Sequence, residues 1–280
     1  MNTALPVHPG RTRVMGILNT TPDSFSDGGL WLDRDRALRH AIDMAAGGAD
    51  IIDIGGESTR PGAAGVSAAE EIDRVAGVVE SVAVETGLTV SIDSSKPEVR
   101  RAAVRAGAGM INDVFALRRE GALEAAAELA VPVCLMHMLG RPRDMQQNPR
   151  YRNVVQDVKA FLLDRVRACQ SAGIDPSRIL LDPGFGFGKT LEHNLKLFRS
   201  LPELCALPYP VLVGVSRKSM LGALTGRPVT ERVLASVTAA VLAAQAGAAV
   251  VRVHDVTATV EALKLAAQLQ PLQTEVSGNG

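Results

Sequence analysis

Polar side chains stand at or near the carboxyl ends of eight short apolar runs in this sequence. They include carboxylates, amides, an imidazole and a guanidinium, which are the groups from which active sites are built. One polar residue after an apolar run is commonly only the start of a turn, but here every run has one. The eight residues are Asn19, Asp53, Asp93, Asn112, His137, Asp182, Ser216 and Arg252.

Cationic residues gather after the last two apolar runs. Arg252 and His254 are two residues apart, so in a strand their side chains point the same way. Guanidinium and ammonium groups clustered at one end of a fold bind phosphate oxygens well, and a diphosphate is their natural partner. The preceding run, 210–216, ends at Ser216 and is followed by Arg217, Lys218 and Ser219, which complete the cluster.

The segment "PGFGFGKT" (183–190) imitates two nucleotide-binding motifs without matching either. Pro183 stands where the first glycine of a triphosphate-binding loop is required. The glycines alternate, whereas a dinucleotide fingerprint needs the spacing G-x-G-x-x-G. The segment is therefore interpreted as a loop that follows Asp182 and brings Phe185 and Phe187 near the site.

The elements that must position these residues alternate along the chain. Apolar runs suited to strands buried on both faces are followed by Ala-rich stretches with helical periodicity. In the first of these stretches one face carries Ala37, Leu38, Ala41, Ile42, Met44 and Ala45. The expected strands are 13–19, 50–56, 88–93, 109–114, 131–137, 178–184, 210–216 and 249–255; the expected helices are 33–48, 70–85, 97–106, 119–129, 153–172, 192–200, 230–246 and 258–269.

A local repeat supports this reading. "GGADIID", "AGAGMIND" and "AGAAVVRV" each run from a helix end through glycine into a strand. Glycine there suits the left-handed residue that terminates a helix. Five positions after Gly48, Gly107 and Gly247 the three repeats place Asp53, Asn112 and Arg252.

Eight such units predict an α/β fold, a single-domain (β/α)₈ TIM barrel, with an open doubly wound sheet as the alternative. The barrel is favoured because it brings all eight strand ends to one face, whereas an open sheet spreads them along a line. We expect an N-terminal arm over 1–12, the barrel over 13–270 and a disordered tail over 271–280.

Composition restricts the function classes. The 280 residues hold 30 Lys plus Arg and 30 Asp plus Glu, and no block is strongly basic. Binding to nucleic acid or to an anionic membrane is therefore not expected. The cysteines, Cys134, Cys169 and Cys205, form no metal-binding or disulfide pattern and suit reduced thiols in the cytoplasm. No apolar run is long enough to cross a membrane, and the first residues lack the apolar core of a signal peptide.

Seven segments in order resemble the dihydropteroate synthase family. They are "MGILNTTPDSFSDGG", "DIGGESTRPGA", "SIDSSKPEV", "INDV", "LDPGFGFGKT", "GVSRKSMLG" and "RVHDV". The resemblance implies a (β/α)₈ transferase of folate biosynthesis, a sulfonamide target that is cytoplasmic and homodimeric. It also implies the reaction, which joins 6-hydroxymethyl-7,8-dihydropterin diphosphate to 4-aminobenzoate, releases diphosphate and uses Mg²⁺.

The resemblance also implies a role for individual residues. The expected pterin contacts are Asp93, Asn112, Met136, Asp182, Phe187 and Lys218. The diphosphate contacts are Thr59, Arg252 and His254, and Asn19 contacts the metal. The arylamine is bordered by Phe25, Arg60 and Pro61, with Arg217 and Ser219 completing the substrate-binding set. The residues expected to act in catalysis are Asp93, Lys218, Arg252 and His254.

Two alternatives remain open on the sequence. A pterin-binding domain of a corrinoid-dependent methyltransferase would share the residues that bind pterin but has no use for a diphosphate grip. A catalytically silent pterin-binding paralogue would have lost residues of the two loops, 20–30 and 56–65, that this sequence keeps. Release of diphosphate that depends on 4-aminobenzoate separates the three.

Overall fold

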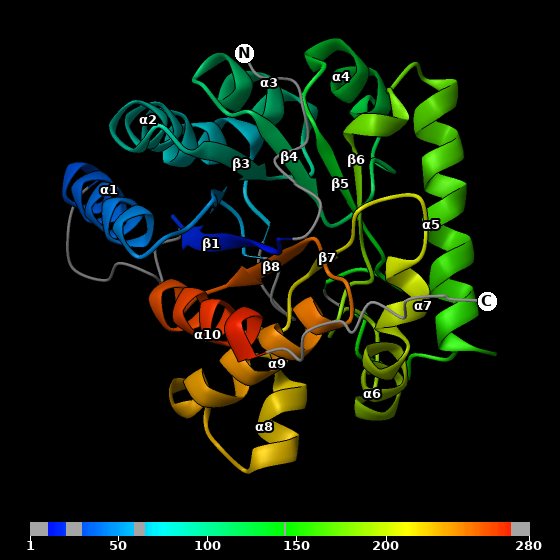
Figure 1. Cartoon of the computed structure of the whole chain (residues 1–280). Helices are drawn as coiled ribbons and strands as arrows, with labels where there is room; N and C mark the ends of the chain where they lie inside the picture. The colour runs from blue at the N-terminus through cyan, green and yellow to red at the C-terminus, as the bar shows by residue number, and fades with distance from the viewer. Residues whose placement is uncertain (1–10, 21–29, 59–64, 143, 270–280) are drawn as a thin grey trace, which may run out of the picture.

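The computed structural model describes residues 11–20, 30–58, 65–142 and 144–269 (Figure 1). In this part of the chain eight parallel strands form one sheet in the order β6-β5-β4-β3-β2-β1-β8-β7. A single bridge between Leu181 and Val211 joins the two end strands, which confirms the expected (β/α)₈ barrel in one domain. The strands are β1 (Arg13–Asn19), β2 (Ile51–Gly55), β3 (Thr89–Asp93), β4 (Met110–Asp113), β5 (Val133–Met136), β6 (Ile179–Asp182), β7 (Leu212–Val213) and β8 (Val250–Val253).

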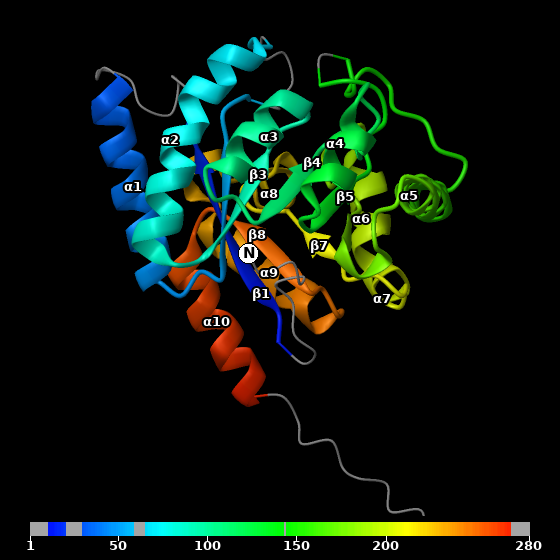
Figure 2. The same cartoon turned by 90° about the horizontal axis from the view of Figure 1, so that it is seen from above.

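Helices cover the outside of the strands in both views (Figures 1 and 2). The described helices are α1 (Leu30–Ala46), α2 (Ala68–Thr86), α3 (Pro97–Arg105), α4 (Ala122–Leu129), α5 (Val154–Ser171), α6 (Leu191–Arg199), α7 (Leu201–Cys205), α8 (Ser219–Thr225), α9 (Val233–Gln245) and α10 (Val256–Leu269). Two 3₁₀ turns, Pro176–Arg178 and Val229–Glu231, precede β6 and α9. None of the described helices has the length and apolarity needed to span a bilayer.

The apolar side chains separate into an inner and an outer core. The outer core lies between the strands and the helices and contains most of the buried Val, Leu, Ile and Ala residues. The inner cluster takes one buried residue from each of seven strands: Met15, Ile51, Met110, Cys134, Leu180, Leu212 and Val250. Apolar packing therefore fills one end of the barrel, and the polar strand ends lie at the other.

The three glycine repeats end their helices in the same way. Gly48, Gly107 and Gly247 have φ values of 93°, 113° and 97°. In the first repeat Gly48 N donates to Ala45 O at 3.0 Å and the next N–H donates to Met44 O at 2.9 Å. The other two repeats form the same pair of hydrogen bonds. The predicted left-handed helix ends are confirmed, and they set where β2, β4 and β8 begin.

Some element boundaries differ from the sequence prediction for identifiable reasons. β7 is two residues long rather than seven, and Pro210 at the start of the predicted strand has no N–H to donate to a neighbour. α4 begins at Ala122 because Gly121, at φ 69°, stops the backbone from being helical earlier. Ile42, which the periodicity puts on one face of α1 with Ala41, is exposed, whereas Ala41 is buried.

Candidate active site

Arg252 on β8 joins two carboxylates at the polar end of the barrel. Its Nε donates to Asp53 Oδ2 at 2.6 Å and its Nη2 donates to Asp93 Oδ2 at 2.9 Å. Burial would lower the pKa of Arg252, but the two carboxylates outweigh it and hold that pKa above its ordinary range. Burial raises the pKa of Asp93 to about 7, although Arg252 acts against this rise. A fixed cation thus stands beside a carboxyl group that titrates near neutrality.

The polar residues of the three glycine repeats meet at Asp53. Asn112 Nδ2 donates to Asp53 Oδ2 at 3.0 Å, and the same oxygen accepts from Arg252. Asp53 is fully buried, and its Oδ1 has no hydrogen-bond partner in the described residues. Asp53 was not among the predicted substrate-binding residues, although its spacing after Gly48 had marked it. It organises the site by holding two residues that were predicted.

Asp182 and Lys218 lie near each other across the β6–β7 side of the barrel. Asp182 is buried and its Oδ1 accepts from Gly184 N at 2.7 Å. Burial raises the pKa of Asp182, and the charge of Lys218 opposes that rise. Burial lowers the pKa of Lys218 to about 8 against the attraction of Asp182. Lys218 Nζ donates to Phe185 O and lies 4.8 Å from the centre of the Phe187 ring.

An apolar surface adjoins these charges. Met136 is buried in a cluster with Val114, Met138 and Met145, and the half-buried ring of Phe187 packs against that cluster. A flat ligand held by Asp182 and Lys218 would therefore meet a thioether and an aromatic ring. Phe185 differs from the prediction: its ring is fully buried against Phe198, and only its carbonyl faces Lys218.

Asn19 and His254 lie at the ends of neighbouring strands, β1 and β8. A Cβ on Gly55 would stand 3.9 Å from Asn19 Oδ1 and 3.6 Å from Asp93 Cβ, so the missing side chain keeps room between them. His254 Nδ1 is 2.9 Å from Ser216 Oγ, and the same hydroxyl accepts from His254 N at 3.2 Å. Ser216 therefore fixes the imidazole ring.

Three predicted residues have other surroundings. His137 does not converge on the site: its ring packs edge-on against Phe161 of α5, 4.9 Å away, and burial lowers its pKa to about 2. Arg217 is directed to Asp255, with Nε 3.1 Å from Oδ2. Ser219 is exposed at the first turn of α8.

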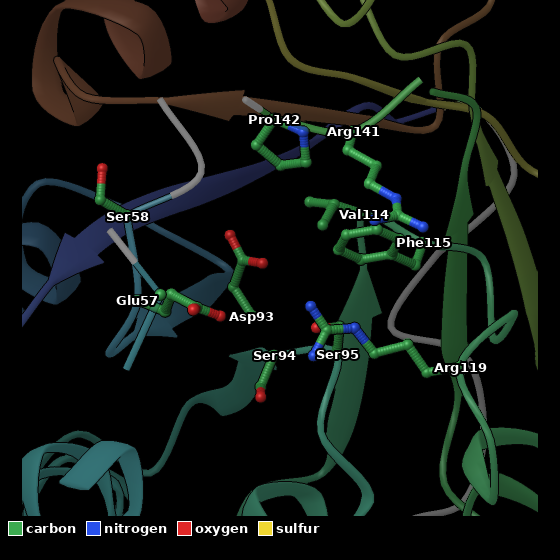
Figure 3. A pocket seen from close by; sticks show the side chains of 11 residues that line it. Glu57, Ser58, Asp93, Ser94, Ser95, Val114, Phe115, Arg119, Arg141 and Pro142 are labelled. Carbon is green, nitrogen blue, oxygen red and sulfur yellow. The ribbon is translucent and has the colours of Figure 1, made fainter. Parts of the chain in front are cut away.

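Four predicted contacts fall outside the described residues: Phe25, Thr59, Arg60 and Pro61. A cavity of about 180 Å³ opens beside the site, and Glu57 and Ser58, which follow β2, line part of it. Asp93 lies on one side of this cavity, and Phe115, Arg119 and Arg141 lie on the other (Figure 3). Arg119 is stacked over the Phe115 ring at 4.6 Å.

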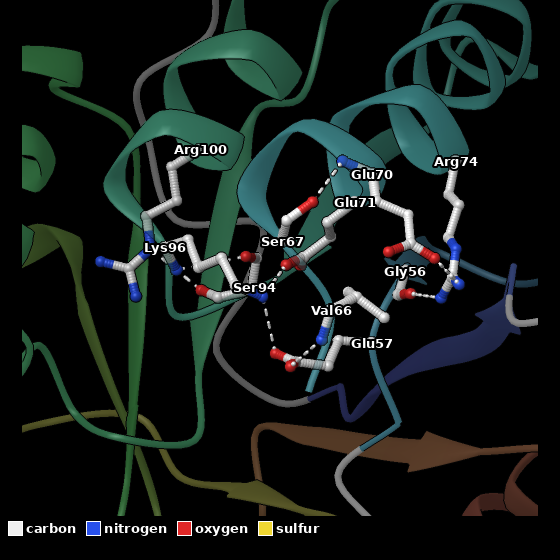
Figure 4. Close-up of polar contacts among 10 residues, drawn as sticks. All are labelled: Gly56, Glu57, Val66, Ser67, Glu70, Glu71, Arg74, Ser94, Lys96 and Arg100. Carbon is white, nitrogen blue, oxygen red and sulfur yellow. Dashed lines mark hydrogen bonds and ion pairs between the residues drawn. The ribbon is translucent and has the colours of Figure 1, made fainter. Parts of the chain in front are cut away.

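A charged network borders this cavity. Lys96 reaches from the start of α3 to Glu57, at 2.9 Å, and to the fully buried Glu71 (Figure 4). Glu57 Oε1 also accepts from Val66 N at 3.1 Å, and Arg74 Nη1 donates to Gly56 O at 2.8 Å. Neither Lys96 nor Glu57 stands out in the sequence, because the ion pair between them joins residues 39 positions apart.

Comparison with known proteins decides the family. The sequence matches the pterin binding enzymes over residues 15–254. It is 53% identical over 253 residues to dihydropteroate synthase of Haemophilus influenzae, covering 90% of this chain and 92% of that protein. It is 51% identical over 258 residues to the Escherichia coli K12 enzyme, covering 92% and 90%. The chain belongs to the dihydropteroate synthase family.

Solved dihydropteroate synthases share its fold. The Xanthomonas albilineans dihydropteroate synthase with 4-aminobenzoic acid is 55% identical with a TM-score of 0.88, over 94% of this chain and 95% of that one. The same enzyme in complex with 7,8-dihydropteroate gives 52% and 0.85 over the same shares. A Yersinia pestis dihydropteroate synthase with a sulfonamide drug gives 50% and 0.89, over 95% and 98%. As a member of the dihydropteroate synthase family, the chain is a transferase.

Proposed function

We propose that this site transfers the pterinylmethyl group of 6-hydroxymethyl-7,8-dihydropterin diphosphate to 4-aminobenzoate. The observation that carries this proposal is the joint placement of Asp182 and Lys218 on one side and Arg252, between Asp53 and Asp93, on the other. Asp182 and Lys218 suit the pterin ring, and Arg252 suits a leaving diphosphate. The X. albilineans complexes with 4-aminobenzoic acid and with 7,8-dihydropteroate support 4-aminobenzoate as a substrate and dihydropteroate as the product.

The pterin ring has a guanidine-like edge that donates two parallel hydrogen bonds. A carboxylate is the complementary acceptor, and Asp182 presents one at a fixed strand end. Asn112 and Asp93 would contact other edges of the ring, and Lys218 would donate to its acceptor side. Met136 and Phe187 would pack on its face.

The bond that breaks joins the pterin CH₂ to a diphosphate oxygen, which keeps the electron pair. The cation left behind is delocalised into the dihydropterin, and ionised Asp93 would stabilise it in a site of low exposure. Arg252 and His254 would hold the departing diphosphate. The lone pair of the arylamine then forms the new C–N bond, and the amine loses a proton. No enzyme nucleophile is required.

Mg²⁺ is proposed to bind near Asn19. Its amide oxygen is a hard donor of the type that Mg²⁺ accepts, and it lies 3.9 Å from the position that a Cβ on Gly55 would take. Within the described residues no group of three His, Cys, Asp or Glu could hold a metal by itself. Substrate diphosphate oxygens and water would therefore supply most of the ligands. Bound there, Mg²⁺ would neutralise charge that develops on the leaving group.

The 4-aminobenzoate would bind toward Ser219, whose hydroxyl at the first turn of α8 suits the carboxylate. Phe25, Arg60 and Pro61 are proposed to border the ring, and Thr59 to contact the diphosphate. Arg217, bound to Asp255, would act by shaping the turn that presents Lys218 and Ser219. Its backbone has φ 57°, and Arg217 N donates to Ser236 Oγ at 2.9 Å.

A homodimer is proposed on the basis of α9. This helix, VLASVTAAVLAAQ, carries no charged residue, and Leu234 and Leu242 are 79% and 48% exposed. A helix that is apolar on all sides is usually covered on all sides.

A cytoplasmic location is also proposed, supported by three cysteines that form no disulfide.

The reaction is tested by measuring diphosphate release from the pterin substrate with and without 4-aminobenzoate. Release that depends on 4-aminobenzoate and yields dihydropteroate is expected. Pterin binding without release would support the silent paralogue. Methyl transfer from a methylated pterin would support the corrinoid-dependent alternative.

A further inference from the structure

Lys189 is a buried lysine that the mechanism above does not use. Lys189 is only 3% exposed. Its Nζ lies 2.9 Å from His137 Nδ1 and donates to Gly184 O at 2.8 Å and to Phe187 O at 3.1 Å. An ammonium has three donors, and these three acceptors use all of them. We propose that Lys189 is a positioning residue for pterin recognition, an inference that rests on the proposed function.

The loop that encloses Lys189 needs an internal donor. Gly184, Gly186 and Gly188 have φ values of 67°, 81° and 64°, so the chain reverses repeatedly between β6 and α6. Such a backbone leaves carbonyls without partners from secondary structure, and buried carbonyls need them. Lys189 supplies hydrogen bonds to two of these carbonyls from within the loop. This accounts for a lysine in a glycine-rich segment that matches no nucleotide-binding motif.

The loop also lies directly against the segment that follows β5. A Cβ on Gly184 would stand 1.9 Å from His137 O, and one on Gly188 would stand 2.3 Å from Leu139 O. Only glycine permits these approaches. The contact between Lys189 and His137 therefore holds the loop against the strand that carries Met136.

The residues that Lys189 holds are adjacent to the proposed pterin contacts. Gly184, whose carbonyl binds Lys189, donates its own N–H to Asp182. Phe187, whose carbonyl also binds Lys189, places its ring below Lys218. Lys218 in turn donates to the carbonyl of Phe185 in the same loop. Displacement of the loop would move the acceptor, the ammonium and the apolar surface of the pterin site together.

This arrangement is complete in either protonation state of the lysine. As an ammonium, Lys189 donates to His137 Nδ1 and to both carbonyls. As an amine, it still donates to both carbonyls and accepts from a protonated Nδ1 of neutral His137. Removal of the side chain, by contrast, leaves two buried carbonyls and a ring nitrogen without their partner.

The test compares wild type with Lys189→Met, which retains the stem and removes the donors. Steady-state rates give the KM for the pterin diphosphate and for 4-aminobenzoate, and calorimetry gives the Kd for 6-hydroxymethyl-7,8-dihydropterin. We expect the pterin KM and Kd to rise about tenfold or more, and the 4-aminobenzoate KM to change less than about twofold. The control is Val166→Ala, which weakens the outer core under α5 and lies outside the loop sequence 183–190. It should lower the melting temperature and leave both KM values unchanged.

The possible results separate the proposals. Pterin binding by Lys189→Met that equals wild type would overturn the positioning role, as would equal rises in both KM values. A wild-type chain that binds no pterin would overturn the proposed function itself. If Lys189→Met does not fold, His137→Phe removes one acceptor and retains an aromatic ring beside Phe161. That variant should raise the pterin Kd in the same direction, and an unchanged Kd would contradict the inference.

Discussion

Arg252 Nε donates to Asp53 Oδ2 at 2.6 Å, although 199 positions of sequence separate the two residues. The same guanidinium reaches Asp93 at 2.9 Å. Asp53 thereby sets the position of the cation that adjoins Asp93, and it does so from the middle of β2, where it is fully buried. The protonation of Asp93 depends on both partners, because Arg252 lowers its pKa and Asp53 raises it.

The rate should depend on pH in two directions. Asp93, with a pKa of about 7, must be ionised to stabilise the pterin cation, so kcat/KM should rise as pH passes that value. Lys218, with a pKa of about 8, must be protonated to donate to the ring, so kcat/KM should fall above that pH. A pH profile of dihydropteroate formation should be bell-shaped and narrow. A rate that stays level from pH 6 to 9, a range set by these two values, would contradict both assignments.

Asp53→Asn should move the acidic side of that profile to lower pH. The substitution removes a negative charge that raises the pKa of Asp93 and keeps an oxygen that can accept from Arg252. The maximal rate should fall because the amide introduces a donor at a buried position. The exposed Asp35→Asn on α1 is the matched control and should leave the profile unchanged. A shift to higher pH would mean that Asp53 acts chiefly by holding Arg252.

Asp182→Asn should weaken pterin binding and leave the fold intact. The amide turns one acceptor into a donor that faces a ring donor, and such a mismatch costs roughly 1–3 kcal/mol. Calorimetric titration with 6-hydroxymethyl-7,8-dihydropterin measures it, with the exposed Asp73→Asn on α2 as control. Unchanged affinity would mean that Asp182 only accepts the hydrogen bond from Gly184 N and does not bind the pterin.

Arg252→Ala should weaken binding of the pterin diphosphate much more than binding of the plain hydroxymethyl pterin. The reason is that Arg252 lies in β8 and His254 directly follows that strand, where the leaving group is proposed to lie. The comparison of the two dissociation constants gives the answer directly. Equal losses would place Arg252 against the ring, or would show that it serves only to balance Asp53 and Asp93.

Periodicity and glycine placement predicted the eight strand–helix units, and the polar residues at the strand ends favoured the barrel over an open sheet. The eight apolar runs became eight strands, and Gly48, Gly107 and Gly247 ended helices as expected. Hydrophobic periodicity and glycine positions depend on residues close together in the sequence, so the sequence alone is enough to predict the elements they define. The length of β7 depends instead on its neighbours in space: it pairs with β8 over two residues and meets β6 at one bridge.

The side chains at the strand ends were harder to predict. Met136 ends β5 and His137 directly follows it, so their side chains point to opposite sides, and the sequence alone does not say which side is the inside. The structure directs Met136 to the site and His137 to Phe161. Asp53 was marked by its spacing, but its role rests on bonds to Asn112 and Arg252 that only the closed barrel creates.

The contact between β6 and β7 is narrow, and pterin binding should reinforce it. The backbone closes this side of the barrel with one bridge and a hydrogen bond from Leu181 N to Pro210 O at 3.0 Å. Asp182 ends the strand on one side of this seam, and Lys218 follows the strand on the other. A pterin that binds both residues would link β6 and β7 where few backbone hydrogen bonds join them. Amide hydrogen exchange at Leu181 and Val213 should then slow on pterin binding more than exchange in β2 or β3. The contacts that bind the substrate would then also stabilise the closed barrel.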